Sequence, residues 1–266
     1  MYNLDYPVMK TERAKTHLDA LNRELNIFLS RDDTLVRKYY EKGSRYICRT
    51  EFAGVPKIVG MLLGEFLYCM RSGLDQLAWH LALQTARDTE DSAHRVCFPI
   101  FETIAGTKNW KNWQRVIKLF PNSVAGVIEA LQPYKGPGSP KDHALWQLNA
   151  LCNIDKHRII PIHSQEAPIF VPITDPPARI EHLDDPDAIE VSVSLADAAK
   201  LKFDPKGSMT IVFGEWGSDF VIPRERLSEI YNFVRDNVIP RFSRFISKAP
   251  ESPVMRVAGA TAVHNG

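Results

Sequence analysis

Apolar residues recur at every third or fourth position over four stretches of the chain, which is the spacing of an amphipathic helix. These stretches cover residues 11–29, 56–87, 122–131 and 145–158. The second is too long and too regular for a strand, and Pro56 stands where a helix tolerates proline in its first turn. We therefore predict a helical layer in the N-terminal part of the chain.

Apolar and polar residues alternate elsewhere, as they do in strands with one buried face. Residues 34–52 alternate on both sides of Lys42-Gly43-Ser44 and predict a small hairpin. Between residues 164 and 222, proline-rich turns separate short alternating segments, which predict an antiparallel sheet of five or six strands. These segments are residues 169–173, 179–183, 190–195, 200–203, 209–213 and 220–222.

The last apolar stripe begins after Pro223 and predicts a C-terminal amphipathic helix, which Pro240 should kink. The predicted fold is α+β: an N-terminal helical layer with a small hairpin, followed by the antiparallel sheet and the C-terminal helix. We assign residues 1–163 to a mainly helical region and residues 164–248 to the sheet with its helix, leaving open whether the two form one continuous domain. Residues 249–266 are predicted to be a disordered tail.

The composition is that of a globular protein with little overall charge. Of 266 residues, 44% are hydrophobic and 24% are charged, and a net charge of +1 gives no global indication of nucleic acid or an anionic membrane. The N-terminal residues have no apolar signal sequence, and no apolar run reaches the about 20 residues of a membrane span. The four cysteines lack CxxC spacing, and the histidines lack ligand-like spacing. We therefore expect a cytoplasmic protein without membrane contact, metal or cofactor.

One helical stretch, LWQLNALCNIDKHR at residues 145–158, carries polar residues in an ordered arrangement. On a helical wheel Asp155 falls in the middle of the apolar face, so its carboxylate is predicted to point toward the core and to need a partner there. Arg71 and Asp75 lie one turn apart on the long helix, beside its apolar stripe. We predict a structural network in which Arg71 pairs with Asp75 and reaches Asp155.

A second set, Asn153, Lys156 and His157, faces away from that network. With Arg158 and Arg71 these residues suit one metal-free reaction, the attack of a ribose 2′-hydroxyl on the adjacent phosphate. His157 would act as general acid or base, and the cations would stabilise the charged phosphorane. The competing interpretation is a solvated helix C-terminus, where cations favourably meet the helix dipole. The network could also be structural and still position a functional His157.

Four segments of the chain resemble a bacterial family of unknown function. They are GEFLYCMRSGLDQLAW at residues 64–79, CFPIF at 97–101, LQPY at 131–134 and LWQLNALCNIDKHR at 145–158. Their order and spacing cover most of the first 160 residues. The resemblance implies a family membership but brings no activity with it.

More remotely, a helical bundle with a polar motif at a helix end is similar to the HEPN superfamily, whose active members are metal-independent endoribonucleases. Of its RNxxxH pattern, Asn153 and His157 match, whereas Cys152 stands in the arginine position. Two hypotheses follow. The first is a non-catalytic binding or structural module of unknown partner; the alternative is a HEPN-like endoribonuclease that acts on RNA, with a homodimer as the arrangement it implies.

Overall fold

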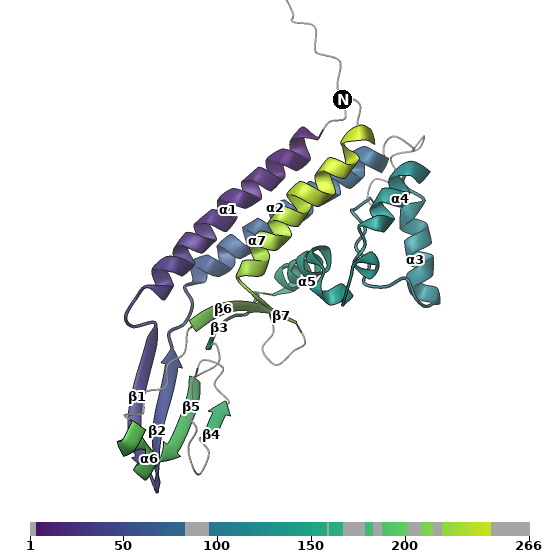
Figure 1. The fold of residues 1–266 in the computed structure, drawn as a ribbon. Coiled ribbons are helices and arrows are strands. Elements are labelled where there is room, and N and C mark those ends of the chain that lie inside the picture. The colour runs from purple at the N-terminus through teal and green to yellow at the C-terminus, as the bar shows by residue number, and fades with distance from the viewer. Residues whose placement is uncertain are drawn as a thin grey trace, which may run out of the picture.

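The computed structural model describes residues 4–82, 96–158, 160–166, 179–182, 188–201, 209–214 and 220–245. Within these ranges the fold is α+β, as predicted: helices lie side by side at one end of the molecule, and a small sheet extends from the other end (Figure 1). None of the described helices combines the length and apolar composition that crossing a bilayer requires. The predicted tail, residues 249–266, lies outside the described residues.

Two long antiparallel helices form the centre of the helical layer: α1 (Asp5–Leu29) and α2 (Lys57–Ala82). Helix α1 begins before the predicted start, and Pro7 lies in its first turn, where a missing N–H costs nothing. Gly73 permits the close approach of the two helices, because a Cβ there would lie 3.3 Å from the Pro7 carbonyl oxygen. The pair therefore forms a rigid base for the remaining elements.

Five further helical elements complete the described layer: α3 (Thr107–Ile117), α4 (Asn122–Ala130), α5 (Ala144–His157), α7 (Glu225–Asn232) and the irregular helix that continues α7. That continuation is a π-helix over Phe233–Val238 and a 3-10 helix over Ile239–Phe245, so the regular α-helix ends before Pro240, and the predicted kink at this proline stays a prediction. Residues of these helices and of the smaller sheet share one hydrophobic cluster. Both halves of the chain therefore contribute to a common core.

The predicted hairpin is confirmed as β1 (Leu35–Lys42) and β2 (Arg45–Phe52), joined through Gly43 with φ 61°. The predicted single sheet is wrong, because the described strands form two antiparallel sheets of fewer than five strands each. The larger has the order β1-β2-β5-β4 and the smaller the order β3-β6-β7. The later strands are β3 (Ile162–Glu166), β4 (Arg179–His182), β5 (Ala188–Ser194), β6 (Met209–Gly214) and β7 (Val221–Pro223).

The segment 200–203 is not a strand where the structure describes it: a short helix, α6 (Leu195–Leu201), covers its first two residues. Ser194 initiates this helix, since its hydroxyl accepts a hydrogen bond from the Asp197 amide at 3.1 Å. The predicted strand at residues 169–173 lies outside the described residues. Alternation therefore located most strands but could not identify their neighbours.

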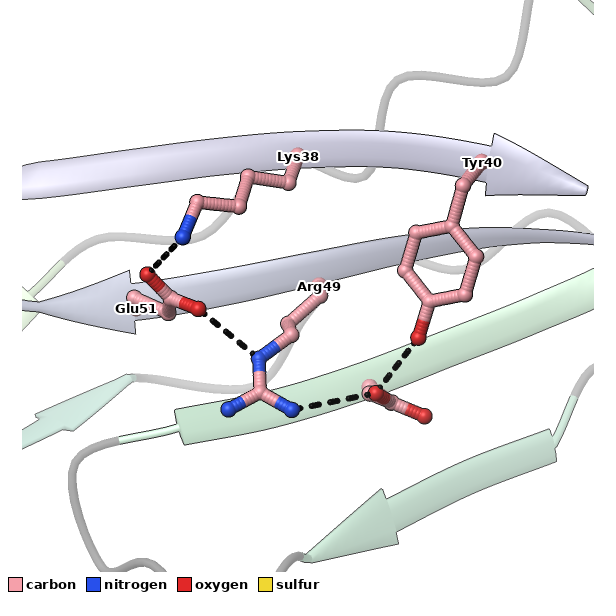
Figure 2. A network of polar contacts seen from close by, with 5 residues as sticks. Lys38, Tyr40, Arg49 and Glu51 are labelled. Atoms are coloured by element: carbon pink, nitrogen blue, oxygen red, sulfur yellow. Dashed lines mark hydrogen bonds and ion pairs between the residues drawn. The ribbon is translucent and has the colours of Figure 1, made fainter.

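One face of the larger sheet carries a network of charges (Figure 2). Arg49 donates to Glu51 at 2.9 Å and to Glu190 at 3.4 Å. Lys38 donates to the other carboxylate oxygen of Glu51, and the Tyr40 hydroxyl donates to Glu190 at 2.7 Å. Each carboxylate in this network thus has a cationic partner.

Candidate functional site

Polar and aromatic side chains line one face of α2, beside its buried arc. Tyr68, Ser72, Gln76 and Trp79 recur at spacings of three and four, so they lie along the same side of the helix. The C-terminal half of α5 faces this stripe, and the two helices are in contact. The site therefore lies between the middle of α2 and the end of α5.

Arg71 and Asp75 form the predicted pair within this stripe. The guanidinium lies 3.0 Å from one Asp75 oxygen and donates to the other from Nε at 3.2 Å. It also donates to the Phe98 carbonyl at 2.9 Å and to the Asn149 side chain at 3.5 Å. The Phe98 amide in turn donates to Asp75 at 2.9 Å. Only 14% of the Arg71 side chain is exposed, so the guanidinium is held by these acceptors inside the protein.

Gln132 also holds residues 97–101 in place through hydrogen bonds to their backbone. Gln132 is fully buried and accepts a hydrogen bond from the Phe101 amide at 2.9 Å. Its amide group donates to the Pro99 carbonyl at 2.9 Å and to the Ile128 carbonyl at 3.0 Å. Residues 64–79, 131–134 and 145–158 therefore meet residues 97–101 here, and their polar side chains hold that segment in place.

Asp155 corrects one prediction. Its side chain is exposed, and no hydrogen bond or ion pair within the described part of the chain joins it to Arg71. The carboxylate instead lies over α2 at Gly64, where an added Cβ would come within 2.9 Å of the carboxylate oxygen Oδ1. The wheel gave the correct direction, toward α2. It could not reveal that a glycine and two cavities leave that side open to solvent.

The two cavities flank Asp155 and Tyr68, which line both of them. The smaller has a volume of about 430 Å³ and extends along α2 past Ser72 and Gln76 to Trp79. The larger has a volume of about 1070 Å³ and extends the other way, past Gly64 to Pro56 and to the start of β3. Because they share these two residues, the two cavities adjoin along α2, and we call them together the α2 groove.

Two residues that line the α2 groove have acceptor atoms without a partner among the described residues. The Gln76 side-chain oxygen is buried and has no hydrogen-bond partner in this part of the chain. Asp155 makes no hydrogen bond or ion pair with the described residues, and its partial burial raises the pKa of the carboxyl group above the ordinary value. At the rim, Tyr68 is 65% exposed and already contacts one cation, the Lys10 ammonium at 5.3 Å from the ring centre. The groove thus presents acceptors and aromatic surface.

The predicted catalytic residues lie at the end of α5. Asn153, Lys156, His157 and Arg158 are all exposed. Lys156 lines the smaller cavity and Arg158 the larger, whereas neither cavity is lined by Asn153 or His157. No contact between described residues joins His157 to Arg71. The structure therefore divides the predicted catalytic set between the groove and the open surface.

Sequence reasoning missed Gly64 and Gln76. A glycine inside a long helix pattern was the available signal for Gly64, because such a glycine costs about 1 kcal/mol relative to alanine and usually has a packing reason. Helix α5 is capped by His143: its ring nitrogen accepts a hydrogen bond from the Leu145 amide at 3.2 Å, and burial lowers the pKa of the imidazole.

The described ranges contain no group of three or more His, Cys, Asp or Glu side chains placed to hold a metal ion. No protein-family model matches the chain, and comparison with curated proteins and with solved structures finds no match.

Proposed function

We propose that the protein is a non-catalytic binding module and that the α2 groove is its ligand site. The observation that carries this proposal is the contrast within the site. Arg71 is engaged by Asp75, Phe98 and Asn149, while Asp155 lines both cavities and makes no hydrogen bond or ion pair with the described residues. A carboxylate without a cationic partner gains free energy when a charged donor binds beside it at a cavity. The smaller cavity, at about 430 Å³, is within the range of small-molecule sites, about 300–1,000 Å³, and the larger, at about 1070 Å³, is slightly above it.

The same contrast argues against RNA cleavage. A general base and a cation must reach one phosphate together. Arg71 is already engaged inside the protein, and His157 lines neither cavity of the groove. The RNA-cleavage reaction that the sequence suggested for His157 would therefore lack Arg71 as a cation to stabilise the phosphorane.

A screen of small molecules by ligand-observed NMR, with wild type and Gly64→Leu, tests the binding proposal. A leucine at this position would project beside Asp155 into the wall of the larger cavity, so we expect hits that bind wild type and not the variant. Gly126→Leu on α4 is the control, because an added Cβ at Gly126 has no atom within 4 Å. The proposal fails if no compound distinguishes Gly64→Leu from the control.

A second assay separates the proposal from the alternative endoribonuclease. Purified wild type and His157→Ala are incubated with mixed RNA in the presence of a chelator. We expect no RNA cleavage by either protein. Cleavage by the wild type that His157→Ala abolishes would instead make the protein a metal-independent endoribonuclease.

A further inference from the structure

We infer that the ligand of the α2 groove is a small organic cation, an ammonium or guanidinium group on an apolar body, and that Asp155 is its counter-ion. This inference rests on the proposed function, because it names the ligand class of the same groove. It depends on which groups of the groove remain free to meet a ligand.

The smaller cavity is lined by a carboxylate that no described residue pairs with. This is Asp155, which is exposed and makes no hydrogen bond or ion pair with described residues. Gln76 also lines the cavity, with its side-chain oxygen buried and without a partner among the described residues. A ligand that satisfies the carboxylate must bring N–H donors, and a positive charge among them offsets the carboxylate.

The cations near the cavity do not favour an anionic ligand. Arg71 also lines the cavity, but it lies 3.0 Å from Asp75 and donates to the Phe98 carbonyl and the Asn149 side chain, so its charge is already balanced. Lys156 lines the cavity as an exposed side chain, next to Asp155 in the chain. In the smaller cavity an anion would therefore place its charge beside an unbalanced carboxylate for the sake of one exposed lysine. The lining of the larger cavity contains Lys57 and Arg158, but also the carboxylates Glu65 and Asp155.

The aromatic rings supply the second element of cation recognition. Tyr68 stands between the two cavities and Trp79 lines the smaller one. Cations bind over the faces of such rings, and the Lys10 ammonium, 5.3 Å from the centre of the Tyr68 ring, is an example within this protein. An apolar body attached to the cation would lie along these rings.

Gly64 makes this arrangement sterically possible. An added Cβ at position 64 would lie only 2.9 Å from the carboxylate oxygen of Asp155, which is too close for a real contact. The missing side chain lets the carboxylate rest against α2, where Asp155 lines both cavities. A cation held by Asp155 can therefore extend its body to either side.

Isothermal titration calorimetry with defined probes tests the inference. Tryptamine and agmatine are the cationic probes, N-acetyltryptamine is the neutral match, and indole-3-propionate is the anionic match. We expect both cations to bind wild type, and tryptamine to bind more tightly than its two matches. Asp155→Asn should weaken the cations about tenfold, and high salt should weaken them in the wild type. Asp19→Asn, an exposed carboxylate on α1, should change nothing.

The outcomes distinguish the inference from the proposed function. Equal affinity of wild type and Asp155→Asn for the cations overturns the role of Asp155, as does N-acetyltryptamine binding as tightly as tryptamine. If neither cation binds, the cationic class is wrong. In that case the proposed function still stands when indole-3-propionate or a compound from the NMR screen binds the wild type and fails to bind Gly64→Leu.

Discussion

Two polar regions of the molecule differ in how their charges are balanced. On the larger sheet, Glu51 and Glu190 each contact Arg49, and Lys38 and Tyr40 complete the network (Figure 2). Along α2 the balance is partial. Arg71 and Asp75 pair with each other and with the backbone of Phe98, whereas the Asp155 carboxylate on α5 and the Gln76 side-chain oxygen on α2 have no partner among the described residues.

The difference indicates which polar residues the fold requires and which are available to a ligand. Groups that satisfy one another stabilise strand pairing or a loop, and they gain little from another molecule. Groups held at a cavity without a partner cost stability, so their presence indicates a role beyond folding. Asp155 and Gln76 belong to this second class, whereas Arg71, which the sequence offered as a catalytic cation, belongs to the first.

Arg71→Ala should have the largest effect. It leaves the Phe98 carbonyl and Asp75 without their donor in a partly buried place, so we expect a loss of about 2–3 kcal/mol in the free energy of unfolding. Arg49→Ala, in the exposed sheet network, should have a much smaller effect. Urea denaturation of both variants measures the difference. Equal losses would contradict the distinction between the two networks.

Gly64→Ala should have an intermediate effect that separates binding from stability. The new methyl group displaces the Asp155 carboxylate, but alanine favours a helix by about 1 kcal/mol, so we expect a stability change below about 1 kcal/mol together with weaker tryptamine binding. Gly126→Ala is the matched control, since its methyl group meets open space. It should be neutral or stabilising and leave binding unchanged. A Gly64→Ala protein that binds like wild type would show that the position of the carboxylate is unimportant.

Lowering the pH should change the contributions of Glu51 and Asp155 to folding stability in opposite directions, each by a small amount. The hydrogen bond from Lys38 lowers the pKa of Glu51, so this group contributes stability above its unfolded pKa that is lost as the pH falls through the folded pKa. Burial raises the pKa of Asp155, so its charge opposes folding above the folded pKa, and the cost disappears below the unfolded pKa. At neutral pH, Glu51→Gln should lower the melting temperature slightly and Asp155→Asn should raise it slightly. Both differences should vanish at low pH.

Much of the helical layer and the hairpin could be predicted, because apolar spacing reports local burial. Residues 34–52 and the helix after residue 56 are examples, and both are present. Strand partners could not be predicted in this way. Strand β2 pairs with β5, about 140 residues later, and nothing in the alternation of either strand specifies the other.

The candidate site was predicted in part. The spacing of Arg71 and Asp75 correctly indicated their pairing, because residues four apart on a helix are neighbours. The position of Asp155 on its wheel indicated its direction but not its exposure, because exposure depends on Gly64 on another helix. The roles proposed for Asn153, Lys156, His157 and Arg158 remain predictions that the assays above address.

The most direct test of this account is the pKa of Asp155, measured by ¹³C NMR of its carboxyl carbon in the free protein. A carboxylate without a cationic partner, lying against α2, should titrate above the ordinary aspartate value of about 3.9, and addition of tryptamine should lower the pKa. A value below 3.9 in the free protein would mean that a cation such as Arg71 already holds the carboxylate. That result would contradict the claim that Asp155 is free to bind a ligand.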